Sequence, residues 1–188
     1  MRELSLHVLD LVQNSLVAGA SLININVNES TAQNLLQIEI KDNGPGIAPE
    51  KLNLVQDPFY TTRTSRRIGL GLSLLQAAAQ RSGGEFKIES MLGAGTDVIA
   101  TFKHDDIDRA PLGNIVDTLL TLIVCNPKAD FCYCHQRDQK QFCFDTREVK
   151  QYVAESEVGM PLIANQIRSY LHSALESLGS IQKQEWVN

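Results

Sequence analysis

One short run, Asp42-Asn43-Gly44-Pro45-Gly46, closes a segment in which apolar and polar residues alternate strictly. Leu36, Ile38 and Ile40 share one parity, so the segment is predicted to be a half-buried strand. Asp42 continues the apolar parity, which directs a carboxylate toward the core. A buried carboxylate needs a donor, so a ligand with an N–H group would suit it, and the glycines would let backbone approach closely. An ordinary turn between strands gives the same pattern.

Regular elements are predicted on both sides of this run. Apolar side chains recur at three- and four-residue spacing over residues 2–18, which predicts an amphipathic helix. Residues 22–28 alternate like residues 35–41, and a polar turn separates them, so the two segments are expected to form a hairpin. Residues 47–68 look irregular apart from a short helix after Pro49. The pattern then predicts a helix at about 71–81 and strands at 85–91 and 96–103.

The composition changes at a charged stretch, residues 104–109, which Pro111 and Gly113 follow, and we place a domain boundary there. The remaining segment predicts a helix at 113–125, strands at 130–136 and 141–147, and a helix at 161–178. The expected fold class is α/β (α+β), with a main domain at residues 1–103 and a small C-terminal α+β domain at residues 104–188.

The net charge of −5 over 188 residues argues against a general nucleic-acid-binding surface, which would need an excess of basic residues. No apolar run is long enough to span a bilayer. The first residues include an acid and start a predicted helix, which is unlike a signal peptide. We therefore expect a cytoplasmic protein without a membrane span.

Two polar side chains on the first predicted helix, Asp10 and Asn14, are four residues apart and project from one face. An amide oxygen can ligate Mg²⁺, and a carboxylate near a phosphate can orient or deprotonate a nucleophile. A solvated polar helix face gives the same spacing, so a purely structural interpretation stays open. His7 lies on the same stripe and is expected to be structural.

Three further motifs suit a nucleoside triphosphate. Gly69-Leu70-Gly71-Leu72 opens the central helix, where free N–H groups and the helix dipole favour phosphate oxygens. It lacks the Gly-Lys-Ser/Thr ending of a P-loop, and no strand leads directly into it as in a Rossmann fold. The run Asp57-Pro58-Phe59-Tyr60-Thr61-Thr62-Arg63 has the side chains of a mobile cover, and Thr96 points inward near Asp42. The alternatives are a flexible helix start, a surface loop and a strand-end threonine.

Together these motifs occur in the order Asp10-x-x-x-Asn14, Asp42-x-Gly44-x-Gly46, Pro58-Phe59-Tyr60-Thr61-Thr62, Gly69-x-Gly71 and Gly95-Thr96. In this order they resemble the GHKL superfamily, which includes DNA gyrase, the Hsp90 chaperone, sensor histidine kinases and the mismatch-repair protein MutL. The resemblance covers residues 1 to about 103 and is closest to histidine kinases and anti-sigma serine kinases. It implies a Bergerat-type two-layer sandwich of a mixed sheet and helices, with ATP between the layers.

The resemblance also implies roles for individual residues. Asn14 would ligate a Mg²⁺ ion that bridges the phosphates, Asp42 would accept a hydrogen bond from the adenine amino group, and Thr96 would support the same site. Residues 57–68 would form a lid whose arginines screen phosphate charge. The set expected to bind ATP and Mg²⁺ is Asn14, Asp42, Gly44, Gly46, Ile47, Thr61, Thr62, Arg63, Arg67, Gly69, Leu70, Gly71, Leu72 and Thr96, with Arg66 as a further lid residue.

Asp10 is the expected catalytic residue, although the family's ATPases and serine kinases usually carry Glu at its position. We expect a stand-alone protein kinase that transfers the γ-phosphate of Mg-ATP to a separate partner protein in bacterial signalling, with Asp10 positioning the acceptor. We expect no helical hairpin with a histidine kinase's phospho-accepting His before the first helix. The alternatives are a nucleotide-gated binding module and a weak ATPase. The apolar stripe in residues 112–123 suits either core packing or a homodimer.

The four cysteines all lie late in the chain, at Cys125, Cys132, Cys134 and Cys143. Cys132 and Cys134 share a strand face, and Cys143 is expected opposite them across the second hairpin. A zinc or redox cluster with Cys125 or His135 is one interpretation, but Cys-x-Cys on a strand lacks the usual Cys-x₂-Cys spacing of zinc sites. Buried, inert thiols are the favoured interpretation.

Overall fold

A computed structural model describes residues 3–52, 70–154 and 160–180 of the chain. Its helices are α1 (Leu4–Val17), α2 (Pro49–Leu52), α3 (Leu70–Arg81), α4 (Ile115–Cys125), α5 (Thr146–Ala154) and α6 (Met160–Leu178). Its strands are β1 (Leu22–Ser30), β2 (Leu35–Asp42), β3 (Phe86–Met91), β4 (Gly95–Lys103), β5 (Asp130–Arg137) and β6 (Lys140–Asp145).

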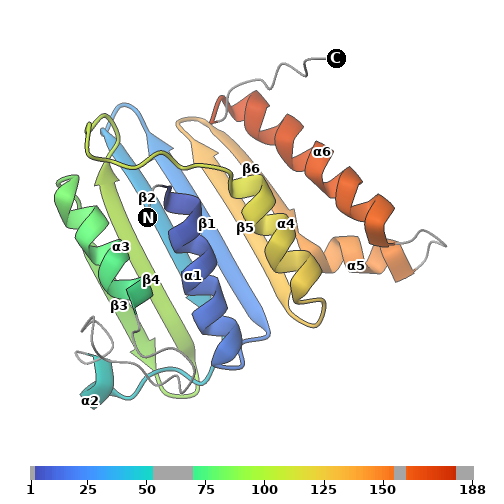
Figure 1. Cartoon of the computed structure of the whole chain (residues 1–188), viewed down its shortest axis with the longest axis horizontal. Helices are drawn as coiled ribbons and strands as arrows, with labels where there is room; N and C mark the ends of the chain where they lie inside the picture. The colour runs from blue at the N-terminus through green and yellow to red at the C-terminus, as the bar shows by residue number, and fades with distance from the viewer. Residues whose placement is uncertain (1–2, 53–69, 155–159, 181–188) are drawn as a thin grey trace.

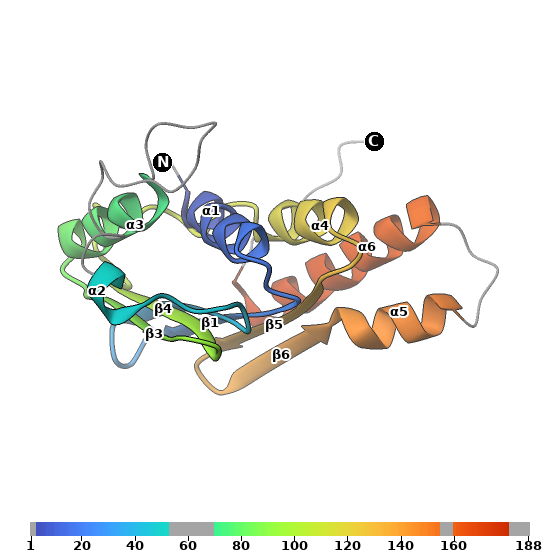
Figure 2. The ribbon, with the colours of Figure 1, turned by 90° about the horizontal axis from the view of Figure 1, so that it is seen from below.

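The six strands form one mixed sheet in the order β3-β4-β2-β1-β5-β6 (Figure 1). All neighbours are antiparallel except β1 and β5, which are parallel. Helices α3, α1 and α4 lie in a layer over the same face of the sheet (Figure 2), and α6 packs against α4 and the last two strands. This arrangement confirms the predicted α+β sandwich of a mixed sheet and helices.

The core lies between the helical layer and the sheet because each element has one apolar face. On β1, the alternation buries Ile23, Ile25 and Val27. On α1, Val8 and Leu11 belong to a buried stripe that meets those strands, and burying each such side chain stabilises the fold by about 1.5–3 kcal/mol. The pattern fixes which face of α1 meets the sheet, and therefore where its polar stripe lies.

The boundary expected after residue 103 falls in the connection between β4 and α4. It does not separate two sheets, because β5 pairs with β1 from Leu22↔Asp130 to Glu29↔Arg137. The buried side chains of the later elements also belong to the same hydrophobic cluster as those of α1 and β1. The sheet and core are thus shared, and a division into independently folding domains stays a prediction.

The sequence pattern did not predict α5. The second strand of the late hairpin was expected to reach residue 147, but β6 ends at Asp145 and a helix begins at Thr146. The Asp145 carboxylate accepts a hydrogen bond from the N–H of Arg147, 2.9 Å away, as a helix-capping residue does. Asp145 followed by Glu148 has the spacing of a capping box, which is the signal that predicts this helix start.

The expectation of buried, inert thiols is wrong. Cys134 and Cys143 face each other across β5 and β6 and form a disulfide, and Cys143 and Cys125 are exposed. Buried Phe131 and Tyr133 occupy the other parity of β5, so the β5 cysteines point away from the helical layer. Within the described residues, no group of three His, Cys, Asp or Glu side chains is arranged to hold a metal ion.

Among the helices in the described part of the chain, none is long and apolar enough to cross a membrane.

Candidate functional site

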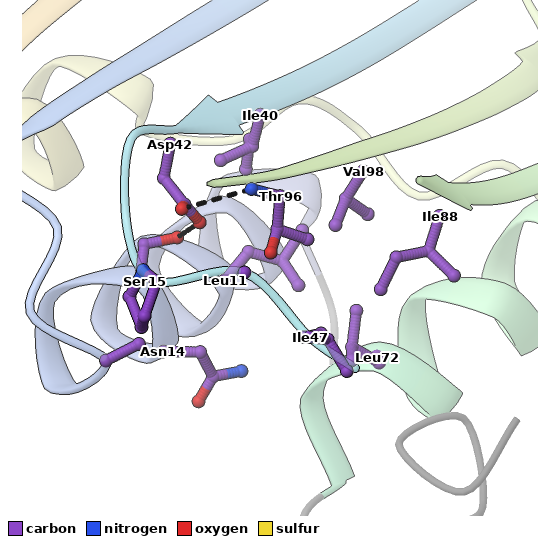
Figure 3. A pocket seen from close by; sticks show the side chains of 13 residues that line it. Leu11, Asn14, Ser15, Ile40, Asp42, Ile47, Leu72, Ile88, Thr96 and Val98 are labelled. Atoms are coloured by element: carbon purple, nitrogen blue, oxygen red, sulfur yellow. Dashed lines mark hydrogen bonds between the residues drawn. The ribbon is translucent and has the colours of Figure 1, made fainter. Parts of the chain in front are cut away.

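The Asp42 carboxylate lies at the end of β2, where the strand meets the glycine run. It faces the helical layer (Figure 3) and the residue is only 9% exposed. One oxygen accepts a hydrogen bond from the Ser15 hydroxyl of α1, 2.6 Å away. The other accepts from the N–H groups of Gly44, at 2.9 Å, and Thr96, at 3.3 Å. These neutral donors satisfy a buried carboxylate and fix its orientation.

The loop after Asp42 packs against the turn between β3 and β4. Gly46 has a φ of 71°, and a Cβ built there would lie 2.1 Å from the carbonyl oxygen of Met91, so a side chain does not fit. The Ser90 hydroxyl accepts a hydrogen bond from the N–H of Ile47 at 2.7 Å and lies 2.9 Å from the Thr96 hydroxyl. The glycine run therefore holds Ile47 beside the pocket that Asp42 enters.

A pocket with about 530 Å³ of atom-free space, part of it open to solvent, lies between α1, the glycine loop, the start of α3 and the inner face of the sheet. Figure 3 shows Asp42 and Ser15 at one side of it and aliphatic side chains at the other. Its lining is Leu11, Asn14, Ser15, Ala18, Ile40, Asp42, Pro45, Gly46, Ile47, Leu72, Ile88, Thr96 and Val98. A flat apolar group with a polar N–H edge fits such a lining.

Asp10 and Asn14 meet the first turn of α3. A Cβ built on Gly71 would lie 3.5 Å from Nδ2 of Asn14, 3.5 Å from Cβ of Asp10 and 3.9 Å from Oδ2 of Asp10. A Cβ at Gly71 would thus make ordinary van der Waals contacts with both side chains, which shows how near the first turn of α3 lies to them. An amide, a carboxylate and the N-terminal end of a 12-residue helix converge beside the pocket.

Several residues predicted for the site come together in the structure. Asn14, Asp42, Gly46, Ile47, Leu72 and Thr96 line the pocket. The N–H of Gly44 donates a hydrogen bond to the Asp42 carboxylate, and Gly71 and Asp10 lie next to Asn14. Thr61, Thr62, Arg63, Arg66, Arg67 and Gly69 lie outside the described residues, as does the lid assigned to residues 57–68, and the same holds for the side chain of Leu70.

Sequence reasoning missed Ser15 and Ser90. Ser15 directly follows Asn14, but its bond to Asp42 spans 27 positions of the chain, so no local pattern reveals it. Ser90 lies on the inward-facing side of β3, where its hydroxyl contacts the N–H of Ile47 and the hydroxyl of Thr96.

His7 is one turn before Asp10 on α1 and is 2% exposed. Burial, together with nearby positive charge, lowers the pKa of His7 to about 4, so its ring is neutral at pH 7. A neutral, buried ring agrees with the structural role expected for it.

Comparison with known proteins places this site in a family. Residues 2–106 match the family model described as histidine kinase-, DNA gyrase B- and HSP90-like ATPase. The chain belongs to this family. The GHKL resemblance read from the ordered motifs is thereby confirmed.

Sensor kinases are among the similar proteins. The histidine protein kinase DivJ of Caulobacter vibrioides is 41% identical over 101 residues, which are 52% of this chain and 17% of DivJ. The sensor protein SrrB of Staphylococcus aureus is 36% identical over 103 residues, 48% of this chain and 17% of SrrB. The match therefore spans about a sixth of the length of these relatives.

A solved structure shares the fold. The N-terminal domain of a DNA repair protein aligns with a TM-score of 0.57 at 18% identity, covering 76% of this chain and 52% of that one. The aligned 76% of this chain is more than residues 2–106 contain. The common fold therefore includes part of the segment after residue 106.

Proposed function

We propose that this chain binds Mg-ATP and transfers the γ-phosphoryl group to a separate partner protein. The observation that carries the binding step is the Asp42 carboxylate, which is buried, held by three neutral donors and placed at the wall of an open pocket. Adenine offers an exocyclic amino group to such an acceptor, and its flat ring suits the aliphatic lining from Leu11, Ile47 and Leu72.

The phosphates would extend from this pocket toward Asn14, Asp10 and the start of α3. Their negative charge is favoured near the N-terminal end of a helix, and Gly71 places only backbone beside Asn14 and Asp10. The amide oxygen of Asn14 is a hard donor of the kind that Mg²⁺ prefers, so this residue fits the ion. Bound Mg²⁺ would neutralise part of the charge on the triphosphate, with the amide oxygen of Asn14 as its ligand.

Asp10 would position the hydroxyl or imidazole of the acceptor for in-line attack and accept its proton when it has one to lose. The bond between the γ-phosphorus and the β,γ-bridging oxygen then breaks, the phosphoryl group passes to the partner and ADP leaves. Asp10 stands beside Asn14 and Gly71, where the γ-phosphate of a bound nucleotide would end. The kinase names of similar proteins add support for the reaction class.

Phosphoryl transfer is tested with γ-labelled ATP, the chain and candidate partners encoded by neighbouring genes. We expect label on a partner with the wild type and at least about 100-fold less with Asp10→Asn, because general-base catalysis contributes about 10²–10⁴-fold. Asp106→Asn, in the connection between β4 and α4, is the matched control and should transfer normally. Label that is independent of Asp10 would contradict its assigned role.

A nucleotide-gated binding module is the second candidate. The observation that favours it is Asp10 itself, whose side chain is one methylene shorter than the Glu usual at this position in the family's ATPases and serine kinases. In that case ATP binds and alters a partner surface without rapid chemistry. Nucleotide-dependent capture of a partner with no transferred label, unchanged by Asp10→Asn, would establish this candidate against the kinase.

A further inference from the structure

The outer face of the hairpin formed by β5 and β6 carries three cysteine side chains. The rings of Phe142 and Phe144 contact Tyr170 of α6 in edge-on and tilted geometries, with centroids 5.5 and 6.4 Å from that of Tyr170. Cys143 lies between them on β6 and therefore points to the other side. Cys132 and Cys134 alternate with buried residues of β5 and share that face. Figure 2 shows α3, α1 and α4 on the opposite side of the sheet. The disulfide between Cys134 and Cys143 therefore lies away from the core.

This disulfide is not needed to hold the hairpin together. The two strands pair continuously from Cys132↔Asp145 to Arg137↔Lys140, and α6 packs on their inner face. The bonded cysteines are only 9 positions apart. A crosslink restricts the unfolded chain less when the loop it closes is short, so this disulfide contributes less to stability than one that closes a long loop. Reduction should therefore leave the hairpin folded.

The two sulfur atoms differ in access. Cys143 is exposed and lies on β6, the edge strand of the sheet, whereas Cys134 is half-buried on β5. An incoming thiolate therefore reaches Cys143 first and expels the sulfur of Cys134. Cys132 has no facing cysteine, since Asp145 lies opposite it. Burial, with a smaller contribution from Asp145, raises the pKa of the Cys132 thiol, so this third sulfur does not compete as a nucleophile.

We propose that Cys134–Cys143 is a thiol–disulfide exchange site that accepts electrons from an external dithiol. The first thiolate of the dithiol attacks Sγ of Cys143, the Cys134–Cys143 bond breaks, and Cys134 leaves as a thiolate that takes up a proton. The second thiol of the dithiol then attacks the mixed disulfide and releases Cys143 as a thiol. The dithiol is oxidised to a disulfide and the hairpin gains two electrons and two protons.

The exchange site is separate from the nucleotide pocket. In the sheet order, β1 and β5 stand between β6 and β2, the strand that ends at Asp42. Because the hairpin keeps its strand pairing without the bond, reduction should not move Asp42. The proposal therefore does not depend on ATP binding, and either can fail without the other.

Thiol counting on the folded 188-residue chain tests the proposal. The chain has four cysteines, two bonded and two free, so the oxidised protein should take up two maleimide groups when denatured without reductant. Incubation of the folded protein with dithiothreitol should raise the count to four, with an unchanged circular dichroism spectrum. Buffers of reduced and oxidised dithiothreitol should give one two-electron transition.

Two variants make the test specific. Cys132→Ser should keep the transition and lower both counts by one, whereas Cys143→Ser should abolish the transition. A disulfide that resists dithiothreitol until the chain is unfolded would overturn the proposal. So would a reduced chain that unfolds, or one in which oxidised dithiothreitol does not restore the bond between Cys134 and Cys143.

Discussion

Two carboxylates are buried at opposite ends of β1 and its neighbours, and they differ in what surrounds them. Asp42, 9% exposed, is paired with Ile23 near the start of β1 and faces an open pocket. Glu29, 8% exposed, lies near the other end of β1. Its two oxygens lie 2.8 Å from Nε2 of His135 and 3.2 Å from Nε2 of His104. The hydroxyl of Tyr133 is 2.7 Å from Nδ1 of His135 and completes the chain of contacts.

Burial alone therefore does not distinguish a carboxylate that binds a ligand from one that stabilises the fold. Burial by itself raises the pKa of Glu29, but hydrogen bonds from His135 and His104 outweigh it and lower the value to about 2. Each oxygen of Glu29 thus has a histidine partner, and the residue joins β1, β5 and the segment after β4. Asp42 has only neutral donors, and its remaining side faces the pocket. The first arrangement stabilises the fold, and the second leaves an acceptor for a ligand.

The largest expected effect is on stability, at Glu29. Glu29→Gln removes the carboxylate to which the rings of His135 and His104 bond, and losing two hydrogen bonds to a charged group costs about 3–5 kcal/mol. Urea unfolding should show this loss, while calorimetry should show unchanged affinity for Mg-ATP.

The matched control is Glu89→Gln, since Glu89 is exposed and its ion pair is with Lys87 on the same strand. It should leave unfolding unchanged. A Glu29→Gln variant of normal stability that lost ATP affinity would reverse the roles assigned to the two carboxylates.

Acid should destabilise the chain in two steps. His7 has a folded pKa of about 4 against 6.5 unfolded, so its contribution is lost as pH falls from 6.5 to 4, because the unfolded state takes up the proton. Glu29 has a folded pKa of about 2 against 4.5, so its contribution is present above 4.5 and is lost as pH falls to 2. Each step is worth about 3 kcal/mol.

Urea unfolding from pH 7.5 to 2.5 measures both steps. His7→Leu should remove the upper one and Glu29→Gln the lower one. If the free energy of unfolding fell equally below pH 4.5 in wild type and Glu29→Gln, the pairing of Glu29 with the histidines would be contradicted.

The smallest expected effect is at Ser15. Ser15→Ala removes one hydrogen bond to Asp42 but keeps those from Gly44 and Thr96, so ATP affinity should fall about fivefold, or about 1 kcal/mol. Ser21→Ala is a matched control, because Ser21 bonds to Asn43 on the exposed side of the same loop. Equal effects of the two variants would mean that Ser15 acts only through the loop.

Local patterns predicted most of the fold. Period-2 alternation identified β1 and β2, and Gly19, with a φ of 95°, follows the end of α1 as expected of a helix stop. The parallel pairing of β1 with β5 joins residues more than 100 positions apart, so no short pattern contains it. Glu29 and His135 lie at positions of their strands where the alternation places apolar residues. This pattern in the sequence indicates a buried polar cluster.

Local patterns likewise predicted one part of the candidate site and missed another. The inward position of Asp42 followed from strand parity, and the meeting of Asp10, Asn14 and Gly71 agrees with the ordered motifs. The contribution of Ser15 depends on how α1 docks on β2, which is a tertiary property. The hairpin predicted that Cys143 lies opposite the cysteines of β5, but not that Cys134 is its partner. The exposure and bonding of these cysteines depend on which face the helices cover.

Calorimetric titration of wild type and Asp42→Asn with Mg-ATP tests the central claim most directly. We expect saturable binding to the wild type and a loss of at least about 30-fold in the variant, because an amide in place of the carboxylate opposes the adenine amino group with a mispaired donor, at about 2 kcal/mol. Unfolding should confirm that the variant is folded. Equal affinity of folded Asp42→Asn and wild type would contradict the placement of adenine in this pocket.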